Sequence, residues 1–231
     1  AVLSAFDSAG QRCSALRVIF LQADVADKMI EMLAGATSEL RAGDPLDYAT
    51  DIGPVIDADA ETMLNAHKLR MRRTAREIVD LPLPPECRHG TYVAPAIYEI
   101  DSIAALEREV FGPILHVARY QRADLDKVCD AVNATGYGLT LGVHTRIAAT
   151  ADRIAERVDV GNIYVNRNQI GAVVGVQPFG GEGLSGTGPK AGGPNYLARF
   201  AVERVRSTDV TASGGNAALL SLAAPGEGSG N

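Results

Sequence analysis

The 231-residue sequence has few cysteines and histidines, and these shortages exclude several classes of protein. Its three cysteines stand far apart without a C-x-x-C pair, which argues against a disulfide framework or a zinc knuckle. The four histidines are scattered and form no H-x-x-x-H pair, so we expect no metal site. Unpaired thiols favour a reducing, cytoplasmic location.

The sequence also lacks a basic excess and long apolar runs. Acidic residues outnumber basic ones and the net charge is −6, which argues against nucleic-acid binding by this segment. No apolar run approaches the roughly 18 residues that would span a bilayer, so we expect no transmembrane segment. The N-terminus shows no signal-peptide pattern. What remains is the composition of an ordinary globular domain, with 46% hydrophobic and 22% charged residues.

Short apolar runs alternate with helical patterns along the first 170 residues. This alternation predicts an α/β fold with a mostly parallel sheet flanked by helices. Glycine then dominates residues 171–194 without any period, residues 196–211 suit an extended strand, and residues 212–231 suit a weakly structured tail. The predicted strands cover 15–22, 77–80, 91–100, 112–121, 139–145 and 161–166, and the predicted helices cover 25–41, 58–73, 123–134 and 147–158.

The three cysteines differ in their surroundings. Cys129 lies on the apolar face of a predicted helix, which favours a buried structural thiol. Cys87 stands two residues before His89, but catalytic Cys–His pairs usually meet across a fold rather than within one short stretch. Cys13 follows a Gly-Gln turn in "SAGQRC", and the guanidinium of Arg12 would favour its thiolate. These features leave Cys13 as either a nucleophile or a partly exposed structural thiol.

The glycine-rich segment contains a G-x-G-x-x-G match at residues 181–186. This pattern marks a dinucleotide-binding turn only where it follows a strand and opens a helix. Pro178 interrupts any strand before it, and Pro189 prevents a helix after it. We therefore reject a nucleotide fingerprint here and expect a loop in which two backbone segments approach closely.

Two charged residues also stay open on the residues alone. Glu109 is either a solvated surface carboxylate or, fixed beside Phe111, a clamp for a diol. Arg167 either neutralises an acid or lies on the surface.

Several motifs occur in the order found in aldehyde dehydrogenases. They are "SAGQRC", "GPVI" at 53–56, "EVFGP" at 109–113, "GLTLGVHT" at 138–145, "GNIYVN" at 161–166 and "PFGGEGLSGTG" at 178–188. Any one is weak, but together, at suitable separations, they are specific. The sequence resembles the aldehyde dehydrogenase family over nearly its whole length. It is most similar to the L-glutamate γ-semialdehyde (Δ1-pyrroline-5-carboxylate) dehydrogenase module of bifunctional bacterial proline utilisation A proteins.

The resemblance implies an activity and roles for individual residues. The activity would be NAD-dependent oxidation of L-glutamate 5-semialdehyde to L-glutamate in proline catabolism, through a cysteine thiohemiacetal and thioester. A related member has serine where this chain has Ala172, and the N–H that would anchor the substrate is kept. The implied residues are Cys13 as nucleophile, Glu109 and Phe111 for the nicotinamide ribose, Ser14, Gly171 and Ala172 for the substrate carboxylate, and Phe179 in the aldehyde channel.

The resemblance also implies what this chain would not contain. The family's dinucleotide-binding domain, its general-base glutamate and its oxyanion-hole asparagine precede the nucleophile. We therefore expect a fragment with a catalytic domain over 1–195, an oligomerisation flap strand over 196–211 and a flexible tail over 212–231. The flap would pair in a homo-oligomer, FAD would be needed only with a proline dehydrogenase module fused upstream, and the isolated chain would be inactive.

Two other hypotheses stay open from the sequence. The scaffold could serve another carboxylated semialdehyde, such as succinic semialdehyde. Alternatively, the chain could be a catalytically silent fragment that only oligomerises, although the intact "SAGQRC", "EVFGP" and "PFGG" motifs argue against a degenerate site. Comparing turnover of L-glutamate 5-semialdehyde and succinic semialdehyde would separate the two enzyme hypotheses. Selective labelling of Cys13 would argue against the silent fragment.

Overall fold

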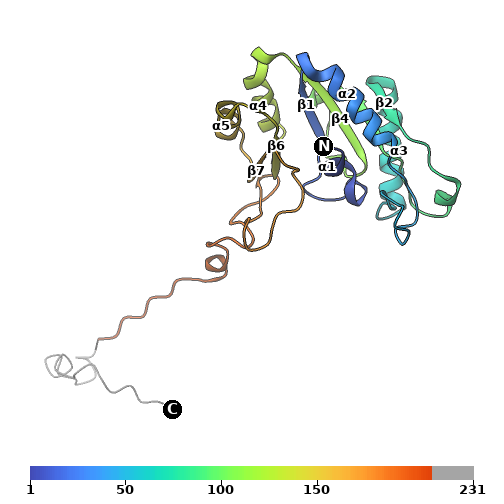
Figure 1. Cartoon of the computed structure of the whole chain (residues 1–231). Helices are drawn as coiled ribbons and strands as arrows, with labels where there is room; N and C mark the ends of the chain where they lie inside the picture. Colours follow the sequence, from blue (N-terminus) through green and yellow to red (C-terminus); the bar gives the residue numbers. More distant parts are fainter. Residues whose placement is uncertain (210–231) are drawn as a thin grey trace. The chain divides into compact units, whose positions relative to one another are not determined.

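The computed structural model describes residues 1–209, which fall into a compact unit, Ala1–Tyr196, and the start of a second unit, Leu197–Asn231. The larger unit contains a four-stranded sheet in the order β1-β4-β3-β2 (Figure 1). Central strand β4 runs parallel to β1 and β3, and edge strand β2 runs antiparallel to β3. The strands are β1 (Val18–Gln22), β2 (Arg76–Asp80), β3 (Ala96–Glu99) and β4 (Ile114–Tyr120). The predicted α/β fold and mostly parallel sheet are confirmed.

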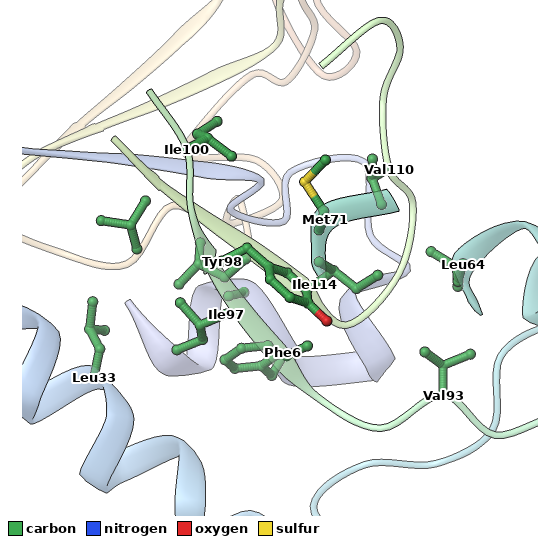
Figure 2. Close-up of a cluster of buried hydrophobic side chains, with 14 of the residues drawn as sticks. Phe6, Leu33, Leu64, Met71, Val93, Ile97, Tyr98, Ile100, Val110 and Ile114 are labelled. Atoms are coloured by element: carbon green, nitrogen blue, oxygen red, sulfur yellow. The ribbon is translucent and has the colours of Figure 1, made fainter. Parts of the chain in front are cut away.

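Helices α1 (Val2–Phe6), α2 (Ala23–Ser38) and α3 (Ala58–Thr74) pack with this sheet. Helix α2, which its periodic apolar residues predict, crosses the strands in Figure 1 and ends at Ser38 rather than at residue 41. Figure 2 shows the resulting core, where Phe6, Leu33 and Met71 from the three helices surround β3. The first five residues of β4 are all buried, as expected for a strand covered on both faces.

A buried ion pair joins α3 to the edge of this sheet. Lys68 Nζ lies 2.6 Å from Asp80 Oδ1, and both side chains are less than a tenth exposed. Asp80 also accepts a hydrogen bond of 3.0 Å from the Tyr98 hydroxyl, and burial together with Asp80 raises the pKa of Tyr98. Charges buried in this way are stable only when paired, so α3 is held in one position against β2 and β3.

Two further two-stranded sheets lie outside the four-stranded sheet. Strands β6 (Thr140–Val143) and β7 (Asn162–Val165) are parallel, while β5 (Tyr137–Gly138) and β8 (Glu182–Gly183) are antiparallel. Helices α4 (Leu125–Asn133) and α5 (Ala148–Arg157) pack together (Figure 1). Cys129 of α4 is buried, as predicted from its place on the apolar face. Short 3-10 helices complete the unit, namely η1 (Asp7–Gly10), η2 (Pro85–His89), η3 (Ile103–Ala105) and η4 (Arg122–Asp124).

Apart from the two-residue β8, the glycine-rich segment is a loop, as predicted, and residues 187–196, directly after the G-x-G-x-x-G match, form no helix. Two backbones do approach closely here, because a Cβ on Gly161 would lie 1.8 Å from the Gly180 carbonyl oxygen. The loop closes through a bridge between Phe179 and Ala191. No helix between residues 1 and 209 combines the length and the apolar character needed to span a membrane.

The second unit begins with a 3-10 helix, η5 (Leu197–Phe200), and residues 201–209 have neither helix nor strand. The predicted flap at 196–211 therefore forms no ladder over its described part. Its last two residues, and the predicted tail at 212–231, lie outside the described residues.

Candidate active site

The proposed nucleophile follows a tight, strained turn. Ser8 and Ala9 adopt left-handed backbone conformations, with φ of 55° and 53°, and Gly10 continues this with φ of 65°. Each non-glycine residue in that region costs about 1–3 kcal/mol, and such strain persists only where the surrounding structure holds it. The chain then presents Cys13 to solvent, whereas Cys87 and Cys129 are buried. Burial raises the pKa of both buried thiols, so they are less reactive than free cysteine.

The nucleophile turn lies directly against the "EVFGP" motif. A Cβ built on Gly10 would lie 2.2 Å from the carbonyl oxygen of Gly112, so only glycine fits at this contact. Val110 and Gly112 are buried around it. Two motifs that are about 100 residues apart in the sequence therefore meet backbone to backbone.

Gln11 joins the same turn to the "GPVI" motif. Its side-chain Nε2 donates to the carbonyl of Pro54 at 3.3 Å, and its Oε1 accepts from the N–H of Ile56 at 2.8 Å. One amide thus satisfies a donor and an acceptor of the same loop. An open groove of about 590 Å³ runs along this junction and is lined by Gln11, Pro54, Val55, Ile56, Ala60, Met63 and Phe111.

Arg17 connects three parts of the site. Its Nε lies 3.1 Å from Glu109 Oε1, and its two terminal nitrogens donate to the carbonyls of Gly10 and, at 3.0 Å, Arg12. The guanidinium carbon also lies 4.5 Å from the centre of the Phe111 ring, a cation–π contact. Arg17 therefore fixes the carboxylate and the ring of "EVFGP" against the nucleophile turn.

The charge next to Cys13 comes from Arg17. Burial lowers the pKa of Arg17, and the nearby Glu109 and Cys13 partly offset this by raising it. Arg12, which the sequence suggested as the neighbouring cation, instead pairs with Asp7 at 3.1 Å and donates to Ser8 Oγ at 2.9 Å. The charge of Arg12 is thus largely neutralised by Asp7 within the turn.

A pair of histidines, of which His116 is buried and His67 half-buried, contacts the backbone of Arg17. The Nε2 atoms of His67 and His116 lie 2.8 Å apart, and His116 Nδ1 lies 3.1 Å from the Arg17 carbonyl. Arg70 donates to His67 Nδ1 at 3.3 Å, which places the His67 proton on Nε2 and the His116 proton on Nδ1. Burial lowers the pKa of both rings to about 4. The neutral pair thus forms a directed chain of donors that ends on the backbone of Arg17.

The loop with the expected substrate-anchoring residues starts beside the nucleophile. Gln169 is buried, and its Nε2 donates to the carbonyl of Ser14 at 3.2 Å. Ser14 itself is buried, Gly171 is exposed and Ala172 is half-buried. Gln169, which the sequence did not single out, thus places the start of this loop beside Ser14. Phe179, half-buried, stands farther along the loop and is tied to Ala191.

The sequence alone did not indicate the residues that join the motifs of the site, namely Gln11, Arg17 and Gln169. For Arg17 a signal exists, because a lone cation at the start of the apolar run "LRVIFL" indicates a partly buried partner. Gln11 and Gln169 act through distant backbone atoms, and no local pattern reveals these.

Comparison with known proteins identifies the family of this chain. The model of the aldehyde dehydrogenase family matches residues 1–205. The chain belongs to the aldehyde dehydrogenase family. This aldehyde dehydrogenase chain is 58% identical to the bifunctional protein PutA of Klebsiella aerogenes over 206 residues. The matched region covers 87% of this chain and 16% of that relative.

Solved structures show that the fold is shared as well. A PutA of Bradyrhizobium japonicum is 62% identical with a TM-score of 0.84, over 88% of this chain and 20% of the other. A 1-pyrroline-5-carboxylate dehydrogenase from Thermus, solved with bound NAD, is 33% identical with a TM-score of 0.79, over 86% of this chain and 38% of the other. These aldehyde dehydrogenase relatives confirm the family and the fold, and the chain spans only a minor part of each.

Proposed function

We propose that this chain supplies the nucleophile, a cofactor clamp and the substrate anchor of an NAD-dependent dehydrogenase that oxidises L-glutamate 5-semialdehyde to L-glutamate. The observation that carries the proposal is the turn at Cys13. Its thiol is exposed, and Gln11 and Arg17 join this turn to the "GPVI" and "EVFGP" motifs. The names of the PutA and 1-pyrroline-5-carboxylate dehydrogenase relatives support a role in proline catabolism.

In the proposed reaction the Cys13 thiolate forms a carbon–sulfur bond to the aldehyde carbon, and the carbonyl oxygen becomes an oxyanion. The N–H of Cys13 has no acceptor within residues 1–209, so it is free to stabilise that oxyanion. NAD, when bound, supplies the hydride acceptor that turns the thiohemiacetal into a thioester. Water then cleaves the carbon–sulfur bond, which releases the acid and restores the thiol.

The residues around the groove fit a nicotinamide ribose. Arg17 engages Oε1 of Glu109 and leaves Oε2 without a hydrogen-bond partner among residues 1–209, so this oxygen can accept from the hydroxyls of a diol. Phe111 is 37% exposed and lines the groove, where it can pack beside a ring. Glu109 and Phe111 would therefore hold the ribose end of NAD.

The experiment is an NADH-production assay with L-glutamate 5-semialdehyde on the full-length protein that carries this chain. We expect Cys13→Ser to lower kcat by roughly a thousandfold or more, because the nucleophile is lost. Cys87→Ala, at a buried thiol away from the turn, is the matched control and keeps activity. A wild-type protein that prefers succinic semialdehyde would redirect the substrate assignment, and NADH production by the 231-residue chain alone would contradict its expected inactivity.

The proposal also includes a homo-oligomer that forms through the flap and a cytoplasmic location of the protein. Leu197, Phe200, Val202 and Val205 are each at least 75% exposed, which suits a flap that pairs with a second copy of the chain. Light scattering would then show an oligomer that Val202→Asp together with Val205→Asp dissociates. The three free cysteines fit a cytoplasmic location.

A further inference from the structure

Arg167 follows strand β7 and organises the loop that begins at residue 168. Its guanidinium carbon lies 4.6 Å from the centre of the Tyr164 ring, so the side chain rests on a residue of the sheet. From there one terminal nitrogen, Nη2, faces two successive carbonyl oxygens, that of Ile170 at 3.4 Å and that of Gly171 at 3.5 Å. Its Nε donates to the carbonyl of Asn168 at 3.1 Å. A single side chain thus orients several peptide groups of this loop.

The orientation of these peptide groups determines where their N–H groups point. The carbonyl of Ile170 shares a peptide group with the N–H of Gly171, and the carbonyl of Gly171 shares one with the N–H of Ala172. Both peptide bonds are trans, so the C=O and the N–H of each point in opposite directions. Because both carbonyls face Arg167, both N–H groups face away from it. Neither N–H donates to any acceptor within residues 1–209.

Gln177 fixes the other end of the loop to the same guanidinium. Its Oε1 accepts from Nη1 of Arg167 at 3.4 Å and from the N–H of Val173 at 3.1 Å. Its own N–H donates to the carbonyl of Val173 at 2.8 Å. The turn over residues 173–177 is therefore closed, and the two free N–H groups stand just before it.

The charge of Arg167 adds to this arrangement. Arg167 pairs with no carboxylate in the part of the chain that the structure describes, since all its contacts are to carbonyl oxygens, amide oxygens and the Tyr164 ring. A cation at the carbonyl end of a peptide group polarises that group and strengthens its N–H as a donor to an anion. Two aligned N–H groups with an uncompensated cation behind them suit a carboxylate.

We propose that Arg167 is a positioning residue that aims the N–H groups of Gly171 and Ala172 at the terminal carboxylate of the substrate, and so sets the preference for carboxylated over uncharged aldehydes. This inference rests on the proposed function of the chain. Each of its three guanidinium nitrogens already donates to an oxygen of this loop, so Arg167 acts through the peptide groups rather than by touching the substrate.

The kinetic test uses the full-length protein with L-glutamate 5-semialdehyde and with pentanal, an uncharged aldehyde of the same carbon number. For Arg167→Gln we expect kcat/KM to fall about tenfold or more with the semialdehyde, mainly through KM, and to change less than about twofold with pentanal. Arg167→Lys keeps the charge but reaches fewer carbonyls, so we expect a smaller loss of the same kind. Arg153→Gln, whose partner is Asp126 between α4 and α5, is the matched control. Equal losses with both aldehydes overturn the role of Arg167.

A binding test on the 231-residue chain does not depend on activity. Glutarate, a dicarboxylate without an aldehyde, should shift the backbone amide resonances of Gly171 and Ala172 in the wild-type chain and not in Arg167→Gln. The absence of these shifts in the wild-type chain overturns the inference even if the variant does not fold. A wild-type enzyme that fails to oxidise the semialdehyde refutes the proposed function instead, so the two failures are distinguishable.

Discussion

Nε of Arg17 lies 3.1 Å from Oε1 of Glu109, across 92 positions of the sequence, and the same guanidinium donates to the carbonyl of Gly10. The side chain of Arg17 is only 16% exposed, so removing it leaves these partners without a donor. We expect Arg17→Gln to lower the free energy of unfolding by about 2 kcal/mol in urea titrations of the chain. Lys28→Gln, in an exposed pair with Glu31, is the control and should change it by less than about 0.5 kcal/mol. Equal effects would contradict the role of Arg17.

The exposure of Cys13 predicts selective alkylation. Iodoacetamide should modify Cys13 at least about tenfold faster than Cys87 or Cys129, because burial raises the pKa of those two thiols and shields them. Peptide mass spectrometry after timed quenching measures the three rates. Cys13→Ser should lose the fast phase, whereas slow and equal labelling of all three cysteines would favour the silent fragment.

The contact between Gly10 and Gly112 predicts that the turn tolerates no side chain. Gly10→Ala would place a methyl group 2.2 Å from a backbone oxygen at a left-handed φ, so we expect it to destabilise the fold by about 2 kcal/mol or more. Gly35→Ala is the matched control, since Gly35 lies in α2 and a Cβ there meets nothing within 4 Å. That control should stabilise the chain by about 0.5–1 kcal/mol, and thermal melts of both variants decide the matter.

The histidine pair predicts that stability falls in acid. The pKa of His67 and His116 is about 4 in the fold and about 6.5 in the unfolded chain, so the unfolded state binds more protons between these values. Their contribution to stability is complete above about pH 6.5 and is lost as pH falls toward 4. Each ring contributes a slope of up to about 1.4 kcal/mol per pH unit.

His67→Gln tests this dependence, because the amide cannot titrate. Urea unfolding at several pH values between 4 and 7.5 should show a shallower slope for the variant than for the wild-type chain. His89→Gln, at an exposed histidine, is the control and should keep the wild-type slope. An unchanged slope in His67→Gln would show that the pair does not titrate as described.

The sequence predicted much of the fold for a local reason. Apolar periodicity identified α2, α3, α4 and α5 to within a few residues, because a helix must bury one face whatever it packs against. The strand at 77–80 was predicted, but its antiparallel pairing as β2 was not, and neither were the two-residue strands β5 and β8, since such pairing depends on a partner elsewhere in the chain. The roles of the predicted site residues remain predictions.

By itself the sequence determined the family, the alternating order of helices and strands, and the place of Cys13 in a turn rather than in the core. Only the tertiary structure decided that Arg17, and not Arg12, is the cation joining the nucleophile turn to Glu109, and that Arg167 orients the loop carrying Gly171. The physical reason is strand pairing. The parallel register of β1 on β4 sets Arg17 beside His116 and the end of "EVFGP", and a register between distant strands is not written in either strand alone.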